Sequence, residues 1–221
     1  MARFQIKICG IRDAAVLDCA VAHGADLVGF IFYPPSPRAI ELFAAAELAA
    51  SVPDRVGTVG VLVDPDDRTL DGLLAHVSLD LLQLHGAESP ERVRAIRDRT
   101  GCRVMKAVRV REAADLDAVA AYAEVADLIM LDARPPLGAV LPGGNGVAFD
   151  WELARGFRCR RPWALAGGLD ADNLAAAIAA TAADIYDVSS GVESTPGVKD
   201  AAKIRAFLAA AARLREPRSD Q

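Results

Sequence analysis

The sequence predicts an α/β fold consisting of a single (β/α)₈ barrel of the TIM type. Short apolar segments alternate eight times with longer stretches that are rich in Ala, Leu and Arg. Parallel strands need a crossover connection, usually a helix, so this alternation indicates a parallel sheet. Eight such units within 221 residues favour closure into a barrel. An open doubly wound sheet is the alternative if one or two strands are wrongly assigned.

The predicted strands are short, apolar and rich in β-branched residues, which suit a pleated backbone. In chain order they are Gln5–Cys9, Leu27–Phe32, Arg55–Val63, Leu81–Leu84, Arg103–Val108, Asp127–Asp132, Trp163–Ala166 and Asp184–Val188. Residues 59–63 read Val-Gly-Val-Leu-Val and residues 128–131 read Leu-Ile-Met-Leu. Such uncharged runs are typical of strands that are covered on both faces.

The predicted helices fill the stretches between these strands and follow the last one. They are Asp13–His23, Glu41–Ala50, Asp66–His76, Pro90–Thr100, Glu112–Ala123, Asp150–Arg155, Asp172–Thr181 and Asp200–Leu214. Ser89 before Pro90 is a typical helix start, with a capping hydroxyl followed by proline at the first helical position. Gly24 and Gly101 stand just past two predicted helix ends, where glycine tolerates a left-handed backbone best.

Composition supports one well-packed domain. Hydrophobic residues make up 52% of the chain and charged residues 25%, which is enough apolar material for a sizeable core. We expect residues 1–215 to form the barrel and the polar residues 216–221 to form a frayed tail. A monomer and a homodimer both stay open, because no predicted helix face stands out as exposed and apolar.

Several classes of partner are disfavoured. The net charge is −5 and Lys and Arg are scattered, whereas nucleic-acid-binding proteins carry a basic stripe. No apolar run approaches the roughly 18 residues that cross a bilayer. The first residues also lack the apolar segment of a signal peptide. We therefore expect a cytoplasmic protein with no nucleic acid and no membrane as partner.

No cofactor is expected either. The four cysteines stand singly and the three histidines lack ligand-like spacing, so the sequence predicts neither disulfides nor a metal site. The motifs G-x-G-x-x-G and G-x-x-x-x-G-K-[ST] are missing from the sequence, so no nucleotide cofactor is expected. The chemistry would then come from side chains.

Three reactive side chains stand at predicted strand ends. Cys9 ends the first strand, His85 follows the fourth, and Asp132 ends the sixth. The carboxyl ends of barrel strands meet at one mouth, where barrel enzymes carry their active sites. A thiol, an imidazole and a carboxylate at that mouth are a set suited to acid–base catalysis. Asp132 stands directly after an apolar run, where packing explains a carboxylate poorly.

Cys9 and His85 each have a structural alternative. Free cysteine is among the most buried residue types, so by position alone Cys9 fits inert packing better than catalysis. Lys7 would share its face of the strand and would lower the pKa of the thiol, which favours the thiolate. His85 fits a loop histidine whose ring is bonded to backbone equally well.

Glycine and serine after the last two strands indicate a phosphate site. Gly167 and Gly168 follow the seventh strand, and Ser189, Ser190 and Gly191 follow the eighth. Glycine lets the backbone approach a ligand closely, and free amides at helix N-termini attract anions. The loops after strands 7 and 8 frequently bind phosphate in TIM barrels. We therefore expect a small phosphorylated substrate.

Two loops at the carboxyl end of the predicted barrel are longer than the rest. Residues 33–38 contain three prolines, and residues 133–147 contain three prolines and four glycines. The second loop is long enough to act as a lid over the mouth. A tolerated surface insertion is the alternative.

The candidate residues lie in strings that form one ordered set. These are Lys7-Ile8-Cys9-Gly10-Ile11, Gly29-Phe30-Ile31-Phe32 before Ser36-Pro37-Arg38, Gln83-Leu84-His85-Gly86, Gly143-Gly144-Asn145-Gly146 with Phe149-Asp150-Trp151, Leu165-Ala166-Gly167-Gly168-Leu169, Asp187-Val188-Ser189-Ser190-Gly191-Val192-Glu193, and Pro196-Gly197-Val198-Lys199-Asp200. Spanning about residues 6–207, the set resembles the phosphoribosylanthranilate isomerase family.

This resemblance implies a TIM-barrel isomerase of tryptophan biosynthesis that uses no cofactor. It would convert N-(5-phosphoribosyl)anthranilate to 1-(2-carboxyphenylamino)-1-deoxyribulose 5-phosphate by an Amadori rearrangement. By the same resemblance, Cys9 is the general base, Asp132 is the general acid and Arg38 binds the anthranilate carboxylate. The substrate-binding residues would be Arg38, His85, Gly167, Gly168, Ser189, Ser190 and Gly191.

The implied reaction needs such groups. A protonated carboxyl must donate to the ring oxygen as the furanose opens to a Schiff base, and burial would keep Asp132 protonated. A base such as the Cys9 thiolate must then remove the proton at C2, and the enolamine tautomerises to the ketone. Arg38 can bind a planar carboxylate with two hydrogen bonds. No hydride or electron is transferred.

Some residues depart from the family pattern, and two other functions stay open. Asn145 and Val147 stand where family members often carry Thr and Lys, and Tyr186 where a small or aliphatic residue is common. The related aminoaldose isomerase of histidine biosynthesis shares the barrel and the chemistry, but it has an aspartate where Cys9 stands here. The third possibility is a barrel that binds phosphosugars without catalysis, which the complete set of candidate residues disfavours.

Overall fold

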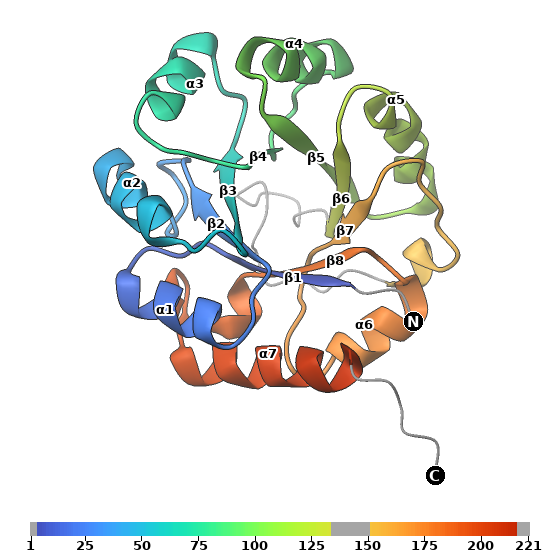
Figure 1. The fold of residues 1–221 in the computed structure, drawn as a ribbon. Coiled ribbons are helices and arrows are strands. Elements are labelled where there is room, and N and C mark those ends of the chain that lie inside the picture. The colour runs from blue at the N-terminus through green and yellow to red at the C-terminus, as the bar shows by residue number, and fades with distance from the viewer. Residues whose placement is uncertain (1–3, 134–150, 216–221) are drawn as a thin grey trace.

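The computed structural model describes residues 4–133 and 151–215, in which eight parallel strands form a closed barrel. The strands follow one another in chain order, and β8 pairs with β1 to close the sheet (Figure 1). They are β1 Gln5–Cys9, β2 Leu27–Ile31, β3 Gly57–Leu62, β4 Leu81–Leu84, β5 Arg103–Val110, β6 Leu128–Ala133, β7 Trp163–Leu165 and β8 Ile185–Val188. The predicted barrel is confirmed, and its strand ends lie within one or two residues of the predicted ones.

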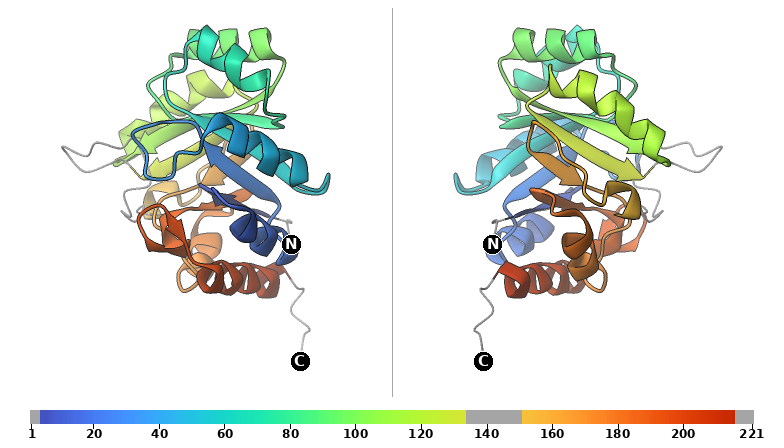
Figure 2. Two further views of the ribbon diagram at one scale, coloured as in Figure 1. Left: turned by 90° about the vertical axis from the view of Figure 1, so that its left-hand side faces the viewer. Right: turned by 90° about the vertical axis from the view of Figure 1, so that its right-hand side faces the viewer.

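Helices pack along the outside of the strands, as the side views show (Figure 2). The α-helices are α1 Ala14–Ala22, α2 Leu42–Ser51, α3 Asp67–Leu74, α4 Pro90–Thr100, α5 Val119–Ala123, α6 Leu174–Thr181 and α7 Ala201–Arg215. The last helix, α7, contacts both α1 and α6, so the first and last helices lie side by side (Figure 1). The outer layer therefore closes at the same place as the barrel.

Helix ends follow the polar signals in the sequence. The Asp13 and Ser89 side chains accept hydrogen bonds from backbone N–H groups in the first turns of α1 and α4. Gly101 ends α4 with φ +68°, in the left-handed region. These caps satisfy amides and carbonyls that have no partner within the helix.

Two predicted helices are wrong in type. The segment predicted as Glu112–Ala123 is a 3₁₀ helix, η1 Ala113–Ala118, followed by the short α5. The Asp115 carboxylate accepts the backbone N–H of Glu112, and such local bonds compete with the α-helical ladder. The segment predicted as Asp150–Arg155 contains η2 Trp151–Ala154, a 3₁₀ turn, which is the usual form of such short pieces.

A hairpin that the sequence did not predict follows β8. After the 3₁₀ turn η3 Ser190–Val192, strands β9 Glu193–Thr195 and β10 Val198–Lys199 pair antiparallel. Gly197 makes the turn with φ +83°, a conformation that favours glycine. The hairpin thus lies directly after the predicted phosphate loop.

Several predictions fall on residues outside the described ranges. These are Asn145, Val147, Asp150, the loop 133–147 beyond Ala133, and the tail 216–221. Their predicted roles, the lid and the frayed end, stay predictions.

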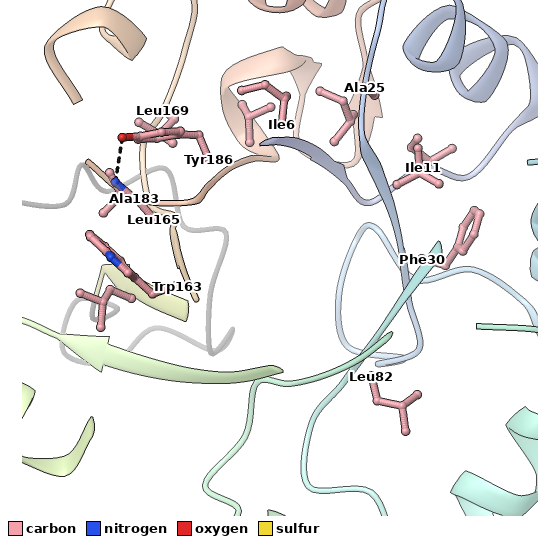
Figure 3. Packing of buried hydrophobic residues seen from close by; sticks show 14 of the residues in the cluster. Ile6, Ile11, Ala25, Phe30, Leu82, Trp163, Leu165, Leu169, Ala183 and Tyr186 are labelled. Atoms are coloured by element: carbon pink, nitrogen blue, oxygen red, sulfur yellow. Dashed lines mark hydrogen bonds between the residues drawn. The ribbon is translucent and has the colours of Figure 1, made fainter. Parts of the chain in front are cut away.

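Strand alternation divides the buried core into two layers. The inner layer fills the barrel and consists of Val59, Leu81, Met105, Ala107, Leu128, Met130, Ala164, Ala166 and Ile185. The outer layer lies between strands and helices, and part of it is seen in Figure 3. Tyr186 belongs to this outer layer, where its hydroxyl accepts the Ala183 N–H at 3.1 Å (Figure 3). Its ring also contacts that of Phe4 edge to face. This departure from the family pattern is therefore accommodated on the outer face of β8.

Candidate active site

Several candidate residues from separate strands come together at the carboxyl end of the barrel. Asp132, near the end of β6, packs against the loop after β7, because a Cβ atom at Gly167 would lie 3.2 Å from its Oδ1. The Ser189 hydroxyl, after β8, donates to the carbonyl oxygen of Cys9 at 3.1 Å. The ends of β6 and β7, and those of β8 and β1, are thus side by side around one mouth.

Cys9 lies in the barrel interior beside a buried ion pair. A Cβ atom at Gly29 would lie 3.1 Å from Cys9 Sγ and 3.2 Å from Lys7 Nζ, so both side chains cover this glycine. Lys7 Nζ donates to Asp187 Oδ1 at 2.8 Å, and all three polar side chains are buried. Lys7 and Cys9 therefore lie on the same inward face of β1, as expected from the sequence.

The protonation of Cys9 differs from the expectation. Burial raises the pKa of the Cys9 thiol above its ordinary value, although Lys7 lowers it. Asp187 raises it further, and Lys199 lowers it slightly. Burial outweighs the two ammonium groups because a thiolate loses its hydration inside the barrel. Lys7 thus lowers the pKa of the thiol as expected, but burial raises it by more.

Asp132 is buried and both of its oxygens are hydrogen bonded. Oδ2 lies 3.0 Å from His85 Nε2, and Oδ1 accepts the Ala133 N–H at 2.9 Å. The other ring nitrogen of His85, Nδ1, lies 2.9 Å from Gln83 Nε2. Strand β5 separates β4 from β6, and its inward residue at the level of Met130 is the small Ala107. Side chains of β4 and β6 can therefore approach each other across the small Ala107 at the level of Met130.

Arg38 is buried, and one edge of its guanidinium is held by Glu193. Nε donates to Oε1 and Nη2 donates to Oε2, both at 2.8 Å. The same carboxylate accepts bonds from Lys199 Nζ at 2.8 Å and from the Gly197 N–H at 3.2 Å. Glu193 uses only the Nε–Nη2 edge, so the Nη1 edge is the one that a ligand carboxylate would meet.

The Arg38 cluster is attached to the strand that carries Cys9. A Cβ atom at Gly10 would lie 3.1 Å from Arg38 Cδ, so the arginine stem packs on the residue that follows Cys9. Lys199 Nζ also donates to Ser189 Oγ at 3.1 Å. Two cations share the single Glu193 carboxylate, so the buried cluster carries excess positive charge. An anionic group of a ligand would balance it.

The pKa values of this cluster follow from burial and pairing. Burial alone would raise the pKa of Glu193, but Arg38 and Lys199 together hold it below its ordinary value. Burial lowers the pKa of Lys199 in spite of the Glu193 carboxylate. Glu193 therefore stays ionised and keeps both hydrogen bonds to Arg38.

The two predicted phosphate loops lie against each other. Gly167 and Gly168 have φ values of +92° and +71°, in the left-handed region where other residues are strained. The carbonyl oxygen of Gly168 accepts a bond from Asn173 Nδ2 at 2.9 Å, just before α6. A Cβ atom at Gly191 would overlap the carbonyl oxygen of Leu169. Glycine at these positions is thus required by the backbone path itself, with or without a ligand.

Comparisons with known proteins agree with this geometry. The family described as N-(5'phosphoribosyl)anthranilate (PRA) isomerase matches residues 6–210. The chain belongs to this family. Isomerases of that name from Paramagnetospirillum magneticum and Paracoccus denitrificans are each 56% identical over 207 residues, covering 94% of this chain and 96% of theirs.

Solved PRA isomerases have the same fold. The enzyme from Thermotoga maritima is 37% identical with a TM-score of 0.85, covering 96% of this chain and 100% of its own. A PRA isomerase solved in complex with reduced 1-(o-carboxyphenylamino)-1-deoxyribulose 5-phosphate is 35% identical with a TM-score of 0.81, at the same coverage. The resemblance predicted from the strings is confirmed.

Five residues of this site were given no role from the sequence, although four of them stand in the strings quoted above. They are Gln83, Arg109, Asp187, Glu193 and Lys199. Arg109, inward on β5, donates from Nη2 to the His85 carbonyl oxygen at 3.0 Å, while its buried Nε has no partner among the residues that the structure describes. The available signal was a charged or polar residue within an apolar strand or within one of the quoted strings. That signal does not tell which residues pair across the barrel.

The ranges that the structure describes are residues 4–133 and 151–215 of the chain. Among these residues, no three His, Cys, Asp or Glu side chains are grouped as metal ligands would be. Within the same ranges, no helix is both long enough and apolar enough to span a bilayer. The four cysteines are free thiols.

Proposed function

We propose that the chain isomerises N-(5'-phosphoribosyl)anthranilate to 1-(2-carboxyphenylamino)-1-deoxyribulose 5-phosphate in tryptophan biosynthesis. The observation that carries the reaction is the match to the PRA isomerase family over nearly the whole barrel. A reduced form of this product is the ligand named for one solved relative. The division of roles among side chains rests on the geometry of the mouth.

Asp132 is the proposed general acid. Its carboxyl would donate a proton to the furanose ring oxygen as the C1–O bond breaks and the nitrogen lone pair forms the Schiff base. The carboxyl is buried at the end of β6, beside the loop after β7 where the substrate would bind. The hydrogen bonds from His85 and Ala133 fix both oxygens and so aim the acid.

Cys9 is the proposed general base. Its thiolate would remove the C2 proton, and the electron pair of that bond would move toward the Schiff base to give the enolamine. The raised pKa of the thiol makes the thiolate scarce in the free protein, yet a more basic thiolate is the stronger proton acceptor. Lys7 lies where it would stabilise the thiolate when it forms.

The two ends of the substrate would meet opposite parts of the mouth. Arg38 would bind the anthranilate carboxylate through its Nη1 edge, while Glu193 holds the other edge in place. Backbone N–H groups around Gly167, Gly168 and the 189–191 turn, with the hydroxyls of that turn, would bind the phosphate. His85 would contact the substrate only next to Asp132, because its Nε2 is already hydrogen bonded to that carboxyl. Free thiols agree with the cytoplasm as the proposed compartment.

The test is a fluorescence assay that follows the loss of N-(5'-phosphoribosyl)anthranilate. We expect turnover by the purified chain, and a loss of kcat of about 10²-fold or more in Asp132→Asn and in Cys9→Ala. Cys102→Ala, the same change at a partly exposed cysteine away from the mouth, should keep full activity. Near-normal turnover by either site variant contradicts the role of that residue. Turnover of the histidine-pathway substrate alone contradicts the reaction.

A further inference from the structure

A buried row of side chains lies beneath the mouth and connects β4 with β6. Gln83 and His85 stand two residues apart on the inward face of β4, and Met130 and Asp132 do so on β6. The Gln83 amide nitrogen lies 2.9 Å from His85 Nδ1 and 3.4 Å from Met130 Sδ. His85 Nε2 then lies 3.0 Å from Asp132 Oδ2. The row thus leads from a neutral amide to the proposed acid.

The orientation of the Gln83 amide follows from the groups around it. In the observed orientation the amide nitrogen donates to Met130 Sδ and lies 2.9 Å from His85 Nδ1, and among the described residues the buried Oε1 has no donor. Rotating the amide by half a turn would set its oxygen against the sulfur, where two acceptors would repel. The observed orientation is therefore the favoured one.

This orientation fixes the proton of His85. Because Gln83 donates to Nδ1, that nitrogen must be unprotonated, and the ring proton of the neutral imidazole lies on Nε2. Nε2 then donates to Asp132 Oδ2. A second proton on Nδ1 would point at the Gln83 N–H group, so the imidazolium form is opposed by the amide.

Nearby charges act in the same direction. Arg109 Nη2 donates to the backbone carbonyl of His85, and Lys106 Nζ donates to the carbonyl of Gly86 and pairs with Glu88. Both cations lie on β5, next to the strand that carries His85, and neither contributes a hydrogen-bond acceptor to the imidazole. Within residues 4–133 and 151–215, the only carboxylate bonded to the ring is that of Asp132.

We propose that Gln83 is a positioning residue that keeps His85 neutral, with its proton on Nε2, so that Asp132 can hold its own proton. An imidazolium beside Asp132 would favour the carboxylate and remove the proton that the acid must donate. A neutral N–H donor orients the carboxyl without that penalty. The catalytic half of this inference rests on the proposed function, whereas the state of the imidazole does not.

The first test is ¹⁵N NMR of the histidine rings at about pH 6, where an ordinary histidine is largely protonated. In the unaltered protein we expect His85 to show an unprotonated Nδ1 and a protonated Nε2. His85→Gln identifies its signals among those of the three histidines. An imidazolium, or a proton on Nδ1 alone, overturns the proposal whatever the activity.

The second test is Gln83→Glu, which keeps the shape of the side chain but replaces the donor with an acceptor. His85 should become an imidazolium by NMR, and kcat should fall about tenfold or more, within the range of general acid catalysis, while KM changes less than about twofold. Gln5→Glu, the same change at an exposed position on β1, should alter neither. Gln83→Met removes the amide altogether, and this second variant tests whether the amide controls the proton position on His85.

The outcomes separate the two claims. An imidazolium in Gln83→Glu with unchanged kcat overturns the catalytic half, as does a fall in kcat with His85 still neutral. Loss of the Nε2–H form in Gln83→Met supports the control by the amide, and its retention in that variant overturns it. If the unaltered protein does not turn over N-(5'-phosphoribosyl)anthranilate, the proposed function fails, while the NMR result still decides the state of His85.

Discussion

At the scale of single residues, the reactive groups are defined by what surrounds them. Cys9 is a buried thiol between one favourable ammonium and one unfavourable carboxylate, and burial decides the balance. Arg38 is a buried guanidinium, and the ionised Glu193 carboxylate binds its Nε–Nη2 edge. In both cases a carboxylate from β8 or the hairpin after it contributes: Asp187 raises the pKa of Cys9 further, and Glu193 holds Arg38 in place.

The raised pKa of Cys9 predicts its alkylation behaviour. Since the thiolate is the nucleophile, the rate of reaction with iodoacetamide should rise with pH and reach its midpoint above that of an ordinary cysteine, about 8.5. Mass spectrometry of digests compares Cys9 with Cys102 and Cys159 in the same sample. Comparing midpoints instead of rates removes the effect of poor access to the buried thiol. A midpoint for Cys9 at or below those of the other two contradicts the prediction.

Arg38 and Glu193 predict a graded loss of substrate binding. Arg38→Met removes a two-pronged, charge-assisted contact worth roughly 1.5–3 kcal/mol, so KM should rise about 10- to 100-fold. Glu193→Gln keeps the length of the side chain but weakens the hold on Arg38, and its KM should rise less. Glu47→Gln, an exposed site on α2, should leave KM unchanged. Steady-state kinetics check this, and an unchanged KM in Arg38→Met removes its assignment.

At the scale of elements, the sequence predicts best what local pattern determines. The apolar runs of β1 and β4 give both strands their observed bounds, and Cys9 and Asp132 stand out as polar residues at strand ends. The β9–β10 hairpin could not be predicted, because strands of two or three residues are stabilised by tertiary contacts. Its Glu193 reaches Arg38 across 155 positions of the chain. No local periodicity encodes such a partner.

Two glycines in different elements predict opposite effects of the same substitution. In Gly29→Ala on β2, the new Cβ would crowd Cys9 Sγ at 3.1 Å and Lys7 Nζ at 3.2 Å. We expect a loss of about 1–3 kcal/mol in stability and a fall in kcat. In Gly72→Ala on α3, no atom lies within 4 Å of the new Cβ, so helix propensity should add about 0.5–1 kcal/mol.

Thermal unfolding and the fluorescence assay measure both variants side by side. The kcat of Gly72→Ala should equal that of the unaltered protein. If Gly29→Ala keeps full activity, the Cys9 and Lys7 side chains have room to move, and the close packing over Gly29 is not needed for turnover.

At the scale of the whole molecule, the barrel closes where its first and last strands pair. Lys7 and Asp187 are register partners across this β1–β8 seam, and their side chains form a buried ion pair 2.8 Å long. Burial alone would lower the pKa of Lys7, but Asp187 and Cys9 together raise it, so the ammonium persists well above neutral pH. The charge pair therefore belongs to the folded state throughout the physiological range, and it joins the closure of the fold to the environment of the thiol.

This pair predicts a non-additive effect on stability. Lys7→Met leaves the Asp187 carboxylate buried without its partner, which should cost about 3–5 kcal/mol in the free energy of unfolding. Lys7→Met with Asp187→Leu removes both charges and should recover most of that loss, since two apolar side chains of similar size can replace a buried pair. Arg92→Met breaks the exposed pair with Asp67 and should change stability by about 1 kcal/mol or less. Urea unfolding followed by circular dichroism measures all three. A double variant no more stable than Lys7→Met would mean that the lysine stem, and not its charge, holds the seam together.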